Sequence, residues 1–280
     1  MIGGSRMISV QQKKPKKRTK LRLMLGITFY RCKRYIEWYT NRKTYASQKQ
    51  NDRLPYSIYT HQTLLLRKLK NVDMWYQHNK IINLKLAIKR IDGLIIKPGE
   101  TFSYWKCIGK TTRKKGYVDG MVLHSGTFKP GVGGGLCQLS NLIYWMTLHT
   151  PLIVTERYRH SYDVFPDSNR TQPFGSGATC SYNYIDLQIT NRTNVTYQLS
   201  LSLSATHLIG EWRATEEQLH TYKVYEKQHA IHPAIFGGYI RHNIIHRKVY
   251  NKQKVEIDDE FITENTAIMM YEPLLDSPKQ

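Results

Sequence analysis

The chain has 280 residues, of which 40% are hydrophobic and 22% charged, and this composition excludes a wholly disordered protein. Its formal net charge of +21 predicts a negatively charged partner, namely nucleic acid, anionic lipid or anionic cell-wall polymer. The sequence carries no helix-turn-helix signature, zinc-finger spacing or aromatic RNA-binding motif, so nucleic acid is the least favoured of the three.

Basic residues dominate the first predicted unit, residues 1–50, and they crowd most closely between Lys13 and Arg22. The apolar stretch from Leu23 to Tyr30 is far shorter than the ~20 residues of a membrane-spanning helix and makes a poor signal peptide. Residues 23–45 instead predict an amphipathic helix. It either packs on the main domain or lies on an anionic membrane surface. We therefore expect a cytoplasmic or peripheral membrane protein, with secretion by a weak signal as the alternative.

The second predicted unit, residues 51–92, has a helical pattern from residue 60 onward. Two runs of apolar residues recur at helical spacing: Leu64, Leu65 and Leu69, then Leu84, Ile88 and Ile91. A break between the two helices is predicted at residues 71–73.

The third predicted unit, residues 93–280, is rich in strand signals. Short strands are predicted at residues 94–96, 101–105 and 121–123, a loop at 129–135 and a helix at 136–148. A β-rich block follows Gly177, with a strand at 182–189, a hairpin turn at 191–194 and a regular alternation at 199–204. Further strands are predicted near residues 222–225, 238–245 and 266–270. The sequence thus predicts an α+β fold: a helical N-terminal region, then a β-rich domain with a Gly-rich loop leading into a central helix.

Cys137 is the strongest candidate for a reactive side chain. It is placed in the first turn of the predicted helix, which begins directly after Gly133, Gly134 and Gly135. Backbone N–H groups and the helix dipole at such a position favour a thiolate and stabilise an oxyanion, so we expect a lowered pKa. Gln138 is the candidate for an additional oxyanion donor.

A nucleophilic cysteine requires a base, and His160 is the first candidate. Asp163 or Asp167 would orient its imidazole, and His124 is the second candidate base. Two other interpretations stay open: a binding loop without catalysis, and a buried cysteine that serves only as a small apolar side chain. It is therefore undecided whether the protein is an enzyme.

No metal site or cofactor is predicted. The four cysteines form no C-x-x-C pair, which disfavours a structural zinc site, and the glycines are not followed by a nucleotide-binding lysine.

An ordered set of motifs resembles the VanW family of accessory proteins from vancomycin-resistance clusters. The motifs span residues 98–105, 109, 111, 116–117, 133–141, 156–157, 160–161, 174–175 and 182–187. The resemblance implies a VanW-type domain and a role around glycopeptide resistance and the cell envelope, without supplying a reaction.

From this resemblance we expect peptidoglycan or its precursors as partners, bound through the loop at Gly133–Ser140. The expected ligand-binding residues are Gly133, Gly134, Gly135, Ser140, Asn141 and Arg157. The alternatives are a hydrolase or transpeptidase-like enzyme that acts on wall peptides with Cys137 and His160, and a nucleic-acid binder that uses the basic N-terminal arm.

Overall fold

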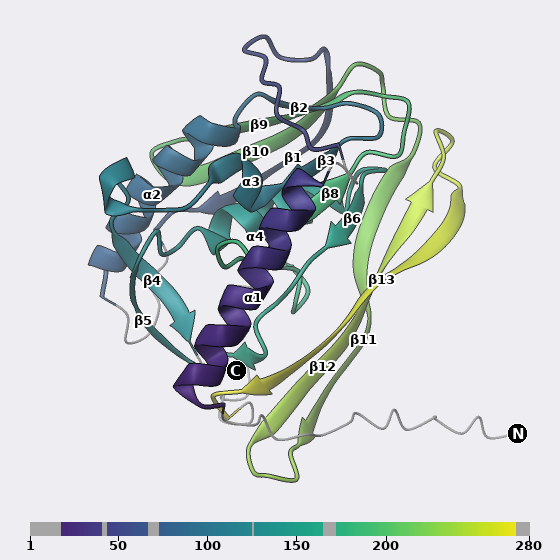
Figure 1. The fold of residues 1–280 in the computed structure, drawn as a ribbon. Coiled ribbons are helices and arrows are strands. Elements are labelled where there is room, and N and C mark those ends of the chain that lie inside the picture. The colour runs from purple at the N-terminus through teal and green to yellow at the C-terminus, as the bar shows by residue number, and fades with distance from the viewer. Residues whose placement is uncertain (1–17, 41–43, 67–72, 125, 165–171, 273–280) are drawn as a thin grey trace, which may run out of the picture.

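The computed structural model describes residues 18–40, 44–66, 73–124, 126–164 and 172–272 (Figure 1). Its helices are α1 (Lys20–Tyr39), α2 (Trp75–Ile91), α3 (Tyr104–Ile108) and α4 (Cys137–Thr147), with a 3-10 turn at Arg113–Lys115. Strands dominate the second half of the chain. The predicted α+β fold, with its Gly-rich loop leading into a central helix, is confirmed.

The first sheet pairs strands from distant parts of the chain. Its order is β1 (Tyr56–Leu64), β10 (His207–Ala214), β9 (Tyr197–Leu203) and β2 (Leu94–Ile96), all antiparallel. Helix α4 packs against β1 and β10. The close approach is possible because β10 carries Gly210, where a Cβ would lie 2.7 Å from the terminal methyl of Met146.

The second sheet is a long antiparallel ribbon that extends along one side of the molecule (Figure 1). It contains β11 (Thr221–Pro233), β12 (Tyr239–Tyr250) and β13 (Glu256–Met269), with the short β7 (Tyr162–Asp163) parallel to β13. A third sheet has the order β3 (Thr101–Ser103), β8 (Gln188–Thr190) and β6 (Ile153–Glu156), and β4 (Asp119–His124) forms a hairpin with β5 (Thr127–Val132).

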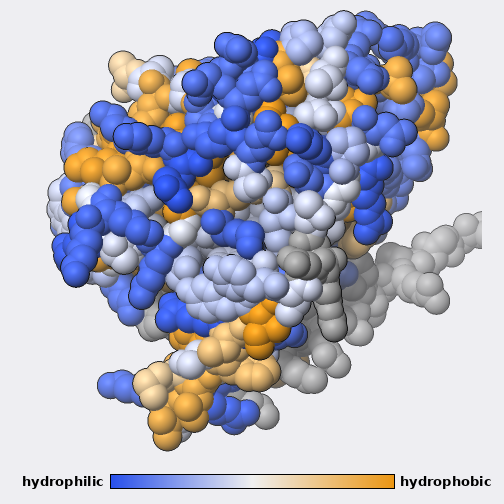
Figure 2. All heavy atoms as spheres, turned by 45° about the horizontal axis from the view of Figure 1, so that its top comes forward, coloured by the Kyte–Doolittle hydropathy of each residue, from blue (hydrophilic) through white to orange (hydrophobic). Residues whose placement is uncertain are grey.

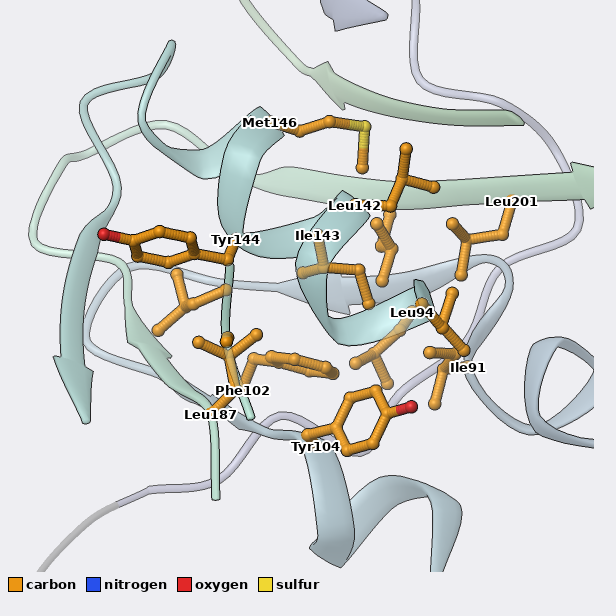
Figure 3. Packing of buried hydrophobic residues seen from close by; sticks show 14 of the residues in the cluster. Ile91, Leu94, Phe102, Tyr104, Leu142, Ile143, Tyr144, Met146, Leu187 and Leu201 are labelled. Carbon is orange, nitrogen blue, oxygen red and sulfur yellow. The ribbon is translucent and has the colours of Figure 1, made fainter. Parts of the chain in front are cut away.

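The hydrophobic core surrounds α4 (Figure 3). Leu142 and Ile143 project from this helix and are almost wholly buried, as are Phe102 on β3 and Leu187 just before β8. Residues on both sides of the helix face apolar neighbours, which is the pattern of a central rather than a surface helix. Most residues of α4 from Leu139 to Thr147 are therefore constrained by packing.

Several sequence predictions of local structure are wrong. Residues 56–64 form strand β1 rather than a helix, because pairing with β10 outweighs the local spacing of the leucines. The first helix ends at Tyr39, since Tyr45 bridges to Thr101 in an extended segment. Most of the expected loop at 129–135 belongs to strand β5.

The β-rich block also differs in detail from the predictions. The strand predicted at 182–189 is found only as β8, which begins at Gln188. The turn at 191–194 connects β8 to β9, which belong to different sheets, so it does not form a hairpin. The extended segment 101–105 becomes helical at Tyr104. Among the described helices, none is both long and apolar enough to cross a bilayer.

Candidate functional site

Gly133, Gly134 and Gly135 form a tightly packed junction between β5 and α4. A Cβ at Gly134 would collide with the backbone of Gly120 on β4. Gly133 and Gly135 have φ angles of +78° and +87°, which side-chain-bearing residues rarely adopt.

The polar backbone groups of this junction are bonded inside the protein. The N–H of Gly133 donates to Val118 and that of Gly135 to Met121, each at 2.9 Å. The carbonyl of Gly134 accepts from Asn83 Nδ2 at 2.9 Å. The glycines thus permit close packing of α2, β4 and α4, and these backbone groups are already committed to protein partners.

Cys137 occupies the first position of α4, as predicted, and the residue is partly buried. Burial raises the pKa of this thiol, and this effect exceeds the opposing contribution of hydrogen bonds from the backbone N–H groups of Cys180 and Cys137. The expectation of a lowered pKa is therefore wrong. The loss of water around the thiolate raises the pKa more than the backbone N–H groups at the start of the helix lower it.

The side chain of Gln138 ties α4 to strand β1. Its amide nitrogen donates to Thr63 Oγ1 at 2.8 Å and to the carbonyl of Leu64 at 2.9 Å. The donor that we assigned to an oxyanion is therefore engaged with β1 in this structure.

His160, the predicted base, and Asp163, the carboxylate predicted to orient it, lie in surroundings that differ from those of a catalytic triad. The carboxylate of Asp163 is buried, where it accepts from Tyr271 at 2.9 Å and forms an ion pair with Arg241 at 3.5 Å. Burial lowers the pKa of His160, with a further contribution from Arg159. Within the described residues, no hydrogen bond joins His160 to Cys137. The side chain of His124 and all of Asp167 lie outside the described residues.

Ser140, Asn141 and Arg157 are brought together on one segment, residues 175–180. Ser140 Oγ donates to the carbonyl of Ala178 at 2.6 Å, and Asn141 Oδ1 accepts from the N–H of the same residue at 2.8 Å. Arg157 Nε donates to the carbonyl of Gly177 at 2.8 Å. The second guanidinium edge of Arg157 reaches Gly175 and the β13 side chains of Thr263 and Asn265.

This arrangement, which we call the Arg157 clasp, consists of Ser140, Asn141, Arg157 and the segment 175–180. It joins α4, β6 and β13 through motif residues that are separated in the sequence. Because its polar atoms bond to one another, the clasp is an element that holds the fold together.

A buried carboxylate lies beside the clasp. Asp186 is fully buried and accepts from Ser103 Oγ at 2.5 Å and from the backbone N–H of Trp105 at 2.9 Å. Burial raises the pKa of this carboxyl to about 7 despite these hydrogen bonds. Nearby, Arg34 of α1 pairs with Glu156 and, at 2.8 Å, with Glu37. The sequence analysis did not identify this network, because its members come from four distant segments.

A hollow of about 390 Å³ opens between the segment after α1, the end of α2 and helix α3. We call it the cationic hollow, and its lining residues are Ala46, Ser47, Lys49, Lys89, Arg90, Leu94, Lys106 and Cys107. Among the described residues this lining contains four cations and no carboxylate.

Two of these cations are held in place by backbone carbonyls. Lys49 Nζ donates to the carbonyl of Lys89 at 3.0 Å, and Lys106 Nζ donates to that of Trp38 at 3.1 Å. Lys106 also lies 4.8 Å from the ring centroid of Tyr45. Cations gathered in a concave surface raise the local concentration of anions, so the hollow is chemically suited to a phosphate or carboxylate group.

Comparison with known proteins identifies related sequences. Residues 79–213 match the family model described as VanW like protein. The chain is 39% identical over 180 residues to vancomycin B-type resistance protein VanW of Enterococcus faecalis (strain ATCC 700802 / V583), in an alignment that covers 64% of this chain and 66% of that protein. It is 34% identical over 112 residues to uncharacterized protein YoaR of Bacillus subtilis (strain 168), where 40% of this chain and 35% of that protein are covered. The chain thus spans less than two thirds of the length of these relatives. No solved structure matches it significantly.

Proposed function

This chain belongs to the VanW family, and from that premise we propose that it is an accessory protein of glycopeptide resistance that binds peptidoglycan or its precursor. The relative from Enterococcus is named a vancomycin B-type resistance protein, which supports the resistance role. The proposal assigns the ligand contact to the cationic hollow.

The observation that carries this assignment is the concentration of positive charge at a concave surface. Lys49, Lys89, Arg90 and Lys106 face one hollow whose described lining has no opposing carboxylate. Nucleotide-linked and lipid-linked wall precursors carry phosphate groups and peptide carboxylates, which pair well with such cations. The glycine junction is a weaker choice of contact surface, because its backbone groups bond within the protein.

A Cys137-dependent hydrolase or transpeptidase is the alternative from another class. Its nucleophile would be a thiolate, and burial of Cys137 opposes that form. The nucleic-acid alternative relies on the basic arm, whose first seventeen residues lie outside the described residues.

The proposal is tested by calorimetric titration of the full chain with a soluble nucleotide-linked muramyl-peptide precursor. We expect saturable binding that a neutral wall disaccharide does not reproduce. Replacement of Lys89 by Ala removes one hollow cation, while its backbone carbonyl still accepts from Lys49.

Loss of a charge-assisted contact of this kind costs on the order of 1–2 kcal/mol, so Lys89→Ala is expected to weaken binding roughly tenfold. The matched control is Lys85→Ala, because Lys85 is exposed on the same helix and is not part of the lining. Absence of any precursor binding would refute the function, and equal losses in both variants would refute the site.

A further inference from the structure

Helix α1 is attached to the protein through polar side chains. Arg31 Nε donates to the carbonyl of Tyr182 at 3.0 Å, and the hydroxyl of Tyr35 lies 3.0 Å from that of Tyr182. Arg34 is buried against Glu156. The ring of Trp38 is also buried, but most of the other large apolar side chains of this helix are exposed. Such exposure is unusual, because an amphipathic helix of a globular protein ordinarily buries its apolar face.

Most of the large apolar residues of α1 face outward. At 100° per residue, one stripe of the helix surface contains Leu21, Leu25, Phe29, Ile36 and Tyr39. These side chains are between 58% and 74% exposed. In Figure 2, hydrophobic side chains gather at the lower end of the molecule, where Figure 1 places the N-terminal half of α1. We call these five residues the α1 stripe.

Cations border one edge of the α1 stripe. The same helical geometry places Arg22 and Lys33 along that edge, and both are exposed. An apolar stripe bordered by cations is the pattern of a helix that lies in the plane of a membrane surface, with its apolar side chains among the acyl chains and its cations at anionic headgroups.

A second copy of the chain fits this surface less well. Each copy has a formal charge of +21, and the cationic edge of the stripe would bring like charges together. An anionic lipid surface offers the opposite charge to the same edge. We therefore propose that the α1 stripe docks the protein on an anionic lipid bilayer, with the helix parallel to the surface.

The test is co-sedimentation of the full chain with vesicles of phosphatidylglycerol and phosphatidylcholine, compared with vesicles of phosphatidylcholine alone. We expect binding only where phosphatidylglycerol is present. Phe29→Glu is expected to weaken that binding at least tenfold, because it removes a ring that would insert into the bilayer and adds a charge that the anionic lipid repels. Since Phe29 is 64% exposed, the variant is expected to fold, which circular dichroism checks.

Leu219→Glu is the matched control, because Leu219 is 65% exposed and lies far along the chain from α1. It adds the same charge and is expected to leave binding unchanged. Equal binding of the wild type and Phe29→Glu would overturn the proposal, since the basic arm alone would then explain it. If the wild type does not bind vesicles but forms a dimer, and Phe29→Glu dissociates that dimer, then the stripe contacts a second copy of the chain and the proposal is overturned. The vesicles contain no wall precursor, so the outcome is independent of the proposed function.

Discussion

Arg157 donates from Nε to the carbonyl of Gly177 at 2.8 Å, across twenty residues of sequence. A Cβ at this glycine would lie 2.7 Å from Asn141 Oδ1. Gly177 is therefore close to both the side chain of Asn141 on α4 and the guanidinium of Arg157. Ser140, Asn141 and Arg157, which we expected to contact a ligand, all bond to the backbone of one segment.

Replacement of Arg157 by Lys tests the Arg157 clasp. Lysine keeps the charge but lacks the planar guanidinium group with several N–H donors. It therefore cannot donate hydrogen bonds to the carbonyls of Gly175 and Gly177 at the same time. Leaving a buried acceptor without its donor costs about 1–3 kcal/mol, and we expect a loss of unfolding free energy of that size. Chemical denaturation measures it, with Arg192→Lys at an exposed position as the control. Equal stability of the two variants would show that the clasp contributes nothing.

Gly134→Ala tests whether the glycine junction is required for packing. The added methyl group meets the backbone of Gly120, which has little room to move, so we expect destabilisation of about 1–3 kcal/mol. The control is Gly26→Ala in α1, where a Cβ meets nothing within 4 Å and helix propensity predicts a small gain. A neutral Gly134→Ala variant would contradict the packing role.

Alkylation of the native chain tests the state of Cys137. Burial raises the pKa of its thiol, so the thiolate fraction at neutral pH is low. Cys32 is exposed on α1 and serves as the internal reference. Mass spectrometry with iodoacetamide at neutral pH is expected to show rapid labelling of Cys32 and slow labelling of Cys137, with the difference abolished in denaturant. Faster labelling of Cys137 would revive the nucleophile hypothesis.

Asp186 predicts a specific dependence of stability on pH. Its pKa is raised from 3.8 to about 7 in the folded protein, so the folded state binds more protons than the unfolded chain between these values. The contribution of Asp186 to stability is complete below pH 4 and is lost as the pH rises to 7. The limiting slope for one proton is about 1.4 kcal/mol per pH unit.

Asp186→Asn removes this titrating carboxyl group. The unfolding free energy of the wild type minus that of the variant should therefore fall as the pH rises from 4 to 7, and this difference cancels other titrating groups. Denaturation curves at several pH values give the measurement. The control variant is Asp258→Asn, which makes the same chemical change at an exposed position. A constant difference for Asp186→Asn would refute the assignment.

The features predicted correctly from sequence are those encoded by neighbouring residues. Helix α4 follows from apolar spacing at 136–148, and β9 follows from the alternation at 199–204. Strand β1 was missed because its partner, β10, lies about 150 residues further along the chain. Local spacing of leucines carries no information about such a partner.

The chemical properties of the site residues also depend on partners that are distant in the sequence. Sequence placed Cys137 correctly at a helix N-terminus, but its pKa depends on burial by distant segments. The cationic hollow combines Lys49 with Lys89 and Lys106, and no pattern in the sequence indicates that these side chains share a surface. Basic residues are abundant throughout this chain, so only the fold distinguishes them.

The most direct test of the account is to locate the bound precursor by hydrogen–deuterium exchange. The full chain would be compared with and without a saturating soluble muramyl-peptide precursor. We predict protection of segments 46–49, 89–94 and 106–107, with exchange at 133–140 unchanged. Protection confined to 133–140 would contradict the assignment of the cationic hollow and return the ligand to the glycine junction.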